Sequence, residues 1–189
     1  LQKFHGFLSD CLLVLTLLVS ARCIAFLFDD KARLDDQATK YVYLIGYIIL
    51  PFVLLVRIPF QENGGFYDPD VIFAMFILIW TNDTFAFVVG KTMGKNKLYP
   101  KISPKKTIEG FIGGVGFTLV VAAIIARYFM RQELYFLVVI ALIVGVIGTI
   151  GDLVESKFKR VAGVKDSGNI MPGHGGILDR LDSVIFAGP

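Results

Sequence analysis

Cysteine and histidine are scarce in this chain, which has two of each among its 189 residues. Both cysteines, Cys11 and Cys23, lie in the first apolar run, and no cluster of cysteine and histidine surrounds them. A disulfide framework or a zinc site needs a denser set of sulfur and imidazole ligands at typical spacings. The sequence therefore predicts neither, and both cysteines are interpreted as small apolar residues of a helix.

Charged residues are nearly absent from several long stretches, although 19% of the chain is charged overall. The chain is 55% hydrophobic, above the roughly 45–50% of soluble domains, and apolar windows of about 18 residues are typical of membrane helices. The expected fold is thus an all-α polytopic membrane bundle. The five expected complete spans are 7–28, 41–58, 71–89, 111–129 and 134–150, and a partial sixth begins at 177. We also expect a chain cut at both ends, because it starts with leucine and stops inside an apolar run.

Lysine and arginine are missing from the expected connection 59–70, whereas residues 90–110 contain six lysines and 153–176 contain four basic residues. Basic residues favour the cytoplasmic side of a membrane. Two spans separate the basic segments, so both are predicted to face the cytoplasm. The predicted organisation is an N-terminal set of spans, 1–70, and a catalytic membrane region, 71–189, with cytoplasmic loops 90–110 and 151–182.

The most polar stretch of the chain is residues 156–182, which combine acids, cations, a histidine and several glycines. Its hydrophobic residues follow neither the period of a strand nor that of a helix. We therefore expect a polar active-site loop, attached to the end of the fifth span, where Asp152 stands.

A second unusual feature is a carboxylate inside the third span, where Asp83 stands between Asn82 and Thr84. A charge at that depth costs at least about 2.5–3.5 kcal/mol on insertion scales. We interpret Asn82 and Asp83 as part of a polar site. The alternative is structural: Asn82 and Thr84 form hydrogen bonds between helices, and Asp83 is merely paired.

The lysine-rich connection 90–110 supports two interpretations equally. Its cations can set the topology of the chain and contact lipid headgroups. Together with nearby hydroxyl groups, they can instead clamp phosphates. The candidate substrate contacts in this connection are Lys95, Lys97, Ser103, Lys105 and Lys106.

Acids and cations on one side of the bundle indicate a common chemistry. Mg²⁺ binds one or two carboxylates together with waters and substrate phosphates, while lysine and arginine hold phosphates and offset their charge. This combination predicts metal-assisted phosphoryl or nucleotidyl transfer. The acids concerned are Asp83, Asp152, Asp179 and Asp182.

His174, in the glycine-rich part of the polar stretch, has two interpretations. It can act as a general base, or it can orient the substrate. We favour the second, because a phosphate nucleophile is already ionised at neutral pH and needs no base.

Residues 156–182 resemble the signature of the CDP-diacylglycerol synthase (phosphatidate cytidylyltransferase) family. The similarity runs through S-K-F-K-R-x4-K-D-S-G-N-I-M-P-G-H-G-G-I-L-D-R-L-D without a departure at the charged and glycine positions. Two further blocks extend it over most of residues 80–182, namely W-T-N-D-T-F-A with G-K-N-K-L-Y-P-K-I-S-P-K-K-T-I-E-G, and G-D-L-V-E-S. Residues 1–70 carry no motif of this kind.

The resemblance implies an integral, multi-pass membrane enzyme, a nucleotidyltransferase of phospholipid biosynthesis. Such an enzyme transfers CMP from CTP to phosphatidic acid and forms CDP-diacylglycerol and pyrophosphate. The resemblance further implies Mg²⁺, a second, monovalent cation such as K⁺, a homodimer in the lipid bilayer and no nucleic-acid partner. It also implies a polar cavity that opens to the cytosol and to the lipid.

By the same resemblance, the metal-holding acids are Asp152 and Asp179. The expected catalytic positions are Asp152, Ser156, Lys159, Arg160, Lys165, Asp166, Asp179 and Asp182. The expected substrate contacts are Asn82, Asp83, Lys95, Lys97, Ser103, Lys105, Lys106, His174 and Arg180.

Two other functions compete with this interpretation. Polyprenol and dolichol kinases also use CTP in a membrane, but they transfer its γ-phosphoryl group. A transporter or channel would line an ion path with Asp83 and Asp152, although the charges gather on one side of the expected bundle. Label from the α-phosphate of CTP enters lipid only with a cytidylyltransferase, and ion flux without CTP turnover would indicate transport.

Overall fold

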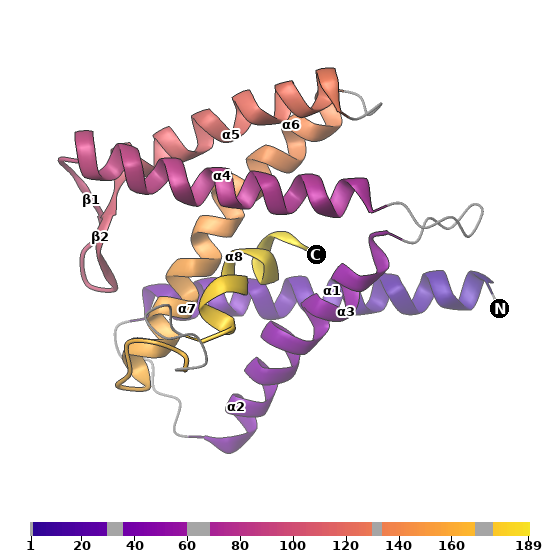
Figure 1. Cartoon of the computed structure of the whole chain (residues 1–189). Coiled ribbons are helices and arrows are strands. Elements are labelled where there is room, and N and C mark those ends of the chain that lie inside the picture. The colour runs from indigo at the N-terminus through magenta and orange to yellow at the C-terminus, as the bar shows by residue number, and fades with distance from the viewer. Residues whose placement is uncertain (1, 30–35, 60–68, 130–133, 169–175) are drawn as a thin grey trace.

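The computed structural model describes residues 2–29, 36–59, 69–129, 134–168 and 176–189. These residues are mostly helical, and they include a single two-stranded sheet (Figure 1). The helices are α1 (Gln2–Phe28), α2 (Gln37–Tyr43), the π-helical η1 (Leu44–Ile49), α3 (Leu50–Arg57), α4 (Asp70–Met93), α5 (Ile108–Tyr128), α6 (Leu134–Ile143), the π-helical η2 (Val144–Gly148), α7 (Thr149–Val161) and α8 (Leu178–Ala187). The strands are β1 (Lys97–Tyr99) and β2 (Ser103–Thr107).

Five helical segments are long and apolar enough to cross a membrane. Many of their large side chains point outward, such as Leu18, Trp80 and Val120. A lipid environment explains this exposure, because soluble proteins rarely leave so much contiguous apolar surface open. The all-α, multi-pass membrane fold is therefore confirmed. The segments are Ser9–Phe28, Gln37–Arg57, Asp70–Met93, Ile108–Tyr128 and Leu134–Val161.

The expected polar loop 151–182 is wrong at both of its ends, because α7 continues as a helix to Val161 and α8 begins at Leu178. The helical pattern in this segment is formed by polar residues. Asp152, Ser156 and Lys159 recur at spacings that put them on one face of a helix, while Leu153 and Val154 are buried in the core. The polar face of α7 points toward other parts of the protein, so its acids and lysine occupy fixed positions on a rigid element.

The lysine-rich connection also has regular structure, since β1 pairs with β2 in an antiparallel hairpin. The start of α5 anchors this hairpin. Thr107 caps α5 by accepting a hydrogen bond from the amide of Gly110 at 3.1 Å. The Glu109 carboxylate accepts hydrogen bonds from the amides of Lys95 and Asn96, each at 3.1 Å. These contacts hold the lysines of the hairpin beside the ends of α4 and α5.

Helix α8 lies between two hydrophobic clusters. Val184 packs into the cluster formed with α3, α4, α5 and α6, while Ile185 and Phe186 pack into the cluster formed with α1, η1 and α7. In Figure 1, α8 (yellow) accordingly lies between the layer of α4 and the layer of α1 and α3. Its acidic residues are therefore held between the two halves of the bundle.

Gly151 allows α8 to approach α7 closely. A Cβ atom at this position would lie 2.8 Å from the carbonyl oxygen of Asp182 and 2.8 Å from Cβ of Phe186. These distances are too short for a side chain, so only glycine fits without a shift. The close approach brings Asp182 beside Asp152, the residue that follows Gly151.

Candidate active site

The polar face of α7 forms one wall of the candidate site. Asp152 and Glu155 lie on it one turn before Ser156 and Lys159, respectively. The Ser156 hydroxyl donates a hydrogen bond to Oδ1 of Asp152 at 3.3 Å. The other Asp152 oxygen, Oδ2, forms an ion pair with Lys106 of the hairpin. Asp152 therefore joins α7 to the lysine-rich hairpin.

Lys159 links two carboxylates on different helices. Its Nζ lies 2.6 Å from Oε2 of Glu155 and 2.6 Å from Oδ1 of Asp179. Charged pairs at this distance, away from bulk water, are stronger than surface pairs, and the Lys159 side chain is only 15% exposed. The ammonium group thus connects the middle of α7 to the first turn of α8.

Asp179 accepts three further hydrogen bonds at its other oxygen, Oδ2. The donors are the Ser167 amide and hydroxyl, both at 2.9 Å, and the Gly176 amide at 2.7 Å. Burial alone would raise the pKa of Asp179, but the Lys159 ammonium and the Ser167 and Gly176 donors outweigh it, so the pKa is lowered. Asp179 is therefore a permanent carboxylate that ties the polar segment to α8.

Three carboxylates converge beside this network. Asp152, Glu155 and Asp182 can each place one oxygen so that all three lie within 4.8 Å of one another. Burial raises the pKa of Asp182, and the neighbouring Asp152 and Glu155 raise it further. The Ser183 amide donates a hydrogen bond to Oδ1 of Asp182 at 2.6 Å.

This acidic cluster fits a divalent cation. Glu155 is 1% exposed, and within the described residues neither of its oxygens accepts a well-aligned hydrogen bond. Lys159 pairs with Oε2 of Glu155, but it shares its single charge with Asp179. Three converging carboxylates therefore call for further positive charge, and Mg²⁺ binds such oxygen ligands. The cluster of three carboxylates includes Asp152 but not Asp179. The oxygens of Asp179 face Lys159, Ser167 and Gly176 instead.

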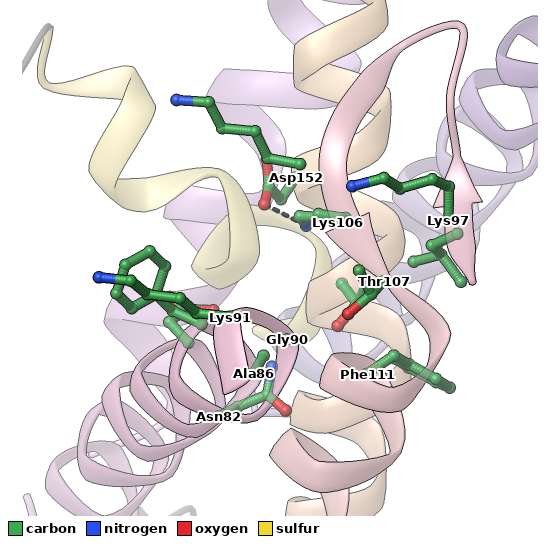
Figure 2. A pocket seen from close by; sticks show the side chains of 14 residues that line it. Asn82, Ala86, Gly90, Lys91, Lys97, Lys106, Thr107, Phe111 and Asp152 are labelled. Carbon is green, nitrogen blue, oxygen red and sulfur yellow. Dashed lines mark ion pairs between the residues drawn. The ribbon is translucent and has the colours of Figure 1, made fainter. Parts of the chain in front are cut away.

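A cavity of about 470 Å³ opens beside Asp152, between α4, the hairpin, α5 and α7 (Figure 2). Four lysines and two aspartates contribute to its wall, and Figure 2 shows the ion pair of Lys106 with Asp152 within it. Its charge and size suit an anionic ligand of nucleotide size. The residues that line it are Asn82, Asp83, Ala86, Phe87, Gly90, Lys91, Lys97, Leu98, Lys105, Lys106, Thr107, Phe111, Thr149 and Asp152.

Asn82 and Asp83, the polar residues within α4, both line this cavity. Asn82 is only 4% exposed, and its Oδ1 accepts no hydrogen bond from any residue that the structure describes. The close approach of α5 at Gly114 places that oxygen at the helix interface. The Asn82 side chain therefore lies between α4 and α5 at the edge of the cavity.

Several expected site residues lie elsewhere. They are outside the set that lines the cavity and make no described contact with the acidic cluster: Lys95, Ser103, Arg160, Lys165, Asp166 and Arg180. Arg160 donates a hydrogen bond to the carbonyl oxygen of Val164 at 3.4 Å, which closes the end of α7. His174 lies outside the described residues.

Sequence reasoning missed Glu155 and Lys91 as members of the site. Glu155 stands three residues after Asp152 and four before Lys159, a spacing that places all three together on a helix. That signal was available but was lost because the segment was interpreted as a loop. Lys91 reaches the cavity because α4 extends to Met93, beyond the expected end of the span.

The fold and the site define a class: a multi-span helical membrane protein with an acidic cluster and a lysine-lined cavity at the ends of its helices. Comparison with known proteins agrees. The model of the cytidylyltransferase family matches residues 3–189. The chain is 50% identical over 190 residues to a phosphatidate cytidylyltransferase of Staphylococcus saprophyticus, covering 100% of this chain and 71% of that protein. It is 51% identical over 190 residues to one of Bacillus subtilis, covering 100% of this chain and 66% of that protein.

Other relatives match over a shorter region. A phosphatidate cytidylyltransferase of Staphylococcus aureus is 53% identical over 116 residues, which is 60% of this chain and 44% of that protein. The alignments thus cover between 44% and 71% of the length of these curated relatives. The chain belongs to the cytidylyltransferase family.

Proposed function

We propose that this site transfers CMP from CTP to phosphatidic acid and forms CDP-diacylglycerol and pyrophosphate. The observation that carries the proposal is the ion pair of Lys106 and Asp152, which joins the lysine-lined cavity to the acidic cluster. One place thus offers cations for phosphates and carboxylates for a divalent ion. The names and identities of the relatives support the same reaction.

In this proposal, Asp152 and Asp179 hold Mg²⁺, with Glu155 and Asp182 beside them, and a second, monovalent cation such as K⁺ accompanies it. Bound Mg²⁺ polarises phosphoryl oxygens and offsets the charge that develops on them. Lys159 connects Asp179 to Glu155, so the two possible ligand sets belong to one network. The carboxylates are rigidly placed by α7 and α8, which suits a site that must position two polyanions.

The reaction needs little covalent help from the protein. An oxygen of the phosphatidate phosphate attacks the α-phosphorus of CTP, and a new P–O bond forms. The bond between the α-phosphorus and the oxygen bridging to the β-phosphorus breaks, and pyrophosphate leaves with that electron pair. Lys106 and Lys159 would stabilise the equatorial and leaving oxygens. The cavity lysines Lys91, Lys97 and Lys105 would hold the nucleotide phosphates.

We further propose that the site faces the cytoplasm and that the protein is a homodimer in the bilayer. The distribution of lysines and arginines supports the orientation. Blue native electrophoresis in mild detergent tests the dimer, and labelling of a single introduced cysteine at Lys101 in sealed cells tests the orientation.

The function is tested with two labelled forms of CTP and phosphatidate in vesicles that contain the protein. Label in the α-phosphate should enter the lipid fraction, and label in the γ-phosphate should appear in pyrophosphate. Incorporation of γ-label into lipid would instead indicate a CTP-dependent kinase. Ion flux across the vesicle membrane without CTP turnover would indicate a transporter.

A further inference from the structure

A second cavity, of about 250 Å³, is lined by a later part of α7 than the lysine-lined cavity. We call it the η1 groove, because η1 and the end of α2 form one of its walls. α7 forms the opposite wall, with Glu155, Phe158 and Lys159, and α8 adds Leu178. The two cavities share no lining residue, so this groove is a separate feature of the same bundle.

The η1 groove contains a buried polar group that lacks a partner. Tyr47 is 4% exposed, and its hydroxyl makes no hydrogen bond within the part of the chain that the structure describes. Its ring packs against Phe158 and Phe186, with centroids 5.5 and 5.6 Å apart. Buried hydroxyls almost always find a partner. The unpaired hydroxyl beside a cavity therefore points to a ligand that supplies an acceptor.

The groove combines a charged end with apolar walls. Lys40, Glu155 and Lys159 line one end, while Leu44, Ile48 and Phe158 contribute most of the surface, which is apolar. Lys159 also contacts Asp179 and Glu155, so this end is continuous with the acidic cluster. A ligand that fills the groove with an apolar chain therefore reaches the cluster with its polar head.

The groove also lies at the depth where a lipid changes from polar to apolar. Lys40 is in the first turn of the span Gln37–Arg57, and Lys159 is in the last turn of the span Leu134–Val161. From Lys40 to Tyr47 the wall runs about 10 Å along the helix axis, which reaches the hydrocarbon region from the membrane surface. Leu44 at the rim is 46% exposed, so the groove has an opening on the outside of the bundle.

We propose that the η1 groove binds the glycerol ester region and the adjoining acyl chain of the lipid acceptor. This inference rests on the proposed function. The acyl chain packs on Leu44, Ile48 and Phe158, and the Tyr47 hydroxyl donates a hydrogen bond to an ester carbonyl. The lipid phosphate then lies at Lys159, beside the acidic cluster. CTP enters through the other cavity, so the two substrates contact successive parts of α7.

The test compares two tryptophan substitutions in the same π-helical segment. Ile48→Trp fills the groove, whereas Ile45→Trp alters a side chain that is 49% exposed and does not line the groove. With the protein reconstituted in vesicles, Ile48→Trp should raise the half-saturating phosphatidate fraction at least about tenfold, the effect of losing the burial of about two methylene groups. The KM for CTP should be unchanged, and Ile45→Trp should match the unmodified protein. Equal effects of both variants on phosphatidate, or none from Ile48→Trp, would overturn the inference.

A smaller change and a direct measurement guard against misfolding of Ile48→Trp. Tyr47→Phe removes only the hydroxyl and should raise the half-saturating phosphatidate fraction about fivefold, as expected for one lost hydrogen bond. Phosphatidate with a photoreactive group near the ester should label η1 and α7 of the unmodified protein; labelling confined to α4 and the hairpin would contradict the inference. If the unmodified protein transfers CMP to no lipid, the proposed function fails first and this inference fails with it.

Discussion

Lys159 and Asp179 form the contact that joins the two helices of the site, with Nζ and Oδ1 2.6 Å apart. The same ammonium lies 2.6 Å from Glu155. Because α7 and α8 each carry part of the acidic cluster, this pair fixes the distance across it. It also places a cation beside the carboxylates that are proposed to hold Mg²⁺.

Removing this cation should impair turnover more than folding. We expect Lys159→Gln to lower kcat at least about 100-fold, the usual loss when a donor to a developing charge is removed. Lys157→Gln is the matched control, because Lys157 donates to the Asp29 carbonyl on another side of α7, at 3.0 Å. Radiolabelled CMP transfer per folded protein measures both. If Lys159→Gln keeps half of the wild-type rate, the ammonium has no part in the chemistry.

Glu155 is predicted to act through the metal. Its buried oxygens accept no well-aligned hydrogen bond among the described residues, and the one ammonium beside them is shared with Asp179, so the acidic cluster needs further positive charge. We expect Glu155→Gln to raise the Mg²⁺ concentration for half-maximal activity about 10–100-fold, as substitutions around metal ligands do. A magnesium titration at saturating CTP measures this. An unchanged magnesium dependence with lowered kcat would show that Glu155 acts in another way.

The lysines of the hairpin should not be equivalent. Lys106 contacts Asp152 and lines the cavity, whereas Lys101 is exposed and lies outside it. We expect Lys106→Met to raise the KM for CTP about tenfold or more, because a charge-assisted contact to phosphate is lost. Lys101→Met should change it less than twofold. If both variants raise the KM for CTP equally, the lysines act only through the summed positive charge of the hairpin.

The close approach of α7 and α8 can be tested by adding a single methyl group at Gly151. Gly151→Ala would place a methyl group 2.8 Å from the Asp182 carbonyl oxygen, and we expect a loss of about 1–3 kcal/mol from overpacking. Gly116→Ala, with nothing within 4 Å of the added atom, is the control. Thermal unfolding in detergent measures stability, and CMP transfer measures the site. A Gly151→Ala protein as stable and active as the control would show that the helices have room to move apart.

Much of the fold could be predicted because the bilayer imposes simple constraints. Long uncharged runs identified the five spans, and their composition alone excluded a soluble domain. The boundaries were less predictable, because the polar end of α7 carries a helical pattern of acids and cations rather than of apolar residues. The hairpin at 97–107 was missed because its short strands carry lysines rather than an alternating apolar pattern, and contacts with Thr107 and Glu109 at the start of α5 anchor it.

Some of the residues that the sequence named as site candidates lie close together in the structure. Asp152, Ser156, Lys159, Asp179 and Asp182 were named from the sequence, and α7 and α8 bring them together. Tyr47 could not be found this way, because nothing in an apolar segment distinguishes a tyrosine beside a cavity from one in the core. Its relevance appears only when η1 packs against α7.

The central claim is that Asp152 and Asp179 hold a divalent ion where CTP and phosphatidate meet. The most direct test is CMP transfer by Asp152→Asn and Asp179→Asn over a range of Mg²⁺ concentrations, with unfolding temperatures measured alongside. Each variant should remain folded and retain less than about 1% of wild-type turnover at any Mg²⁺ concentration. If either one reaches a near wild-type rate with the same Mg²⁺ dependence, the claim is contradicted.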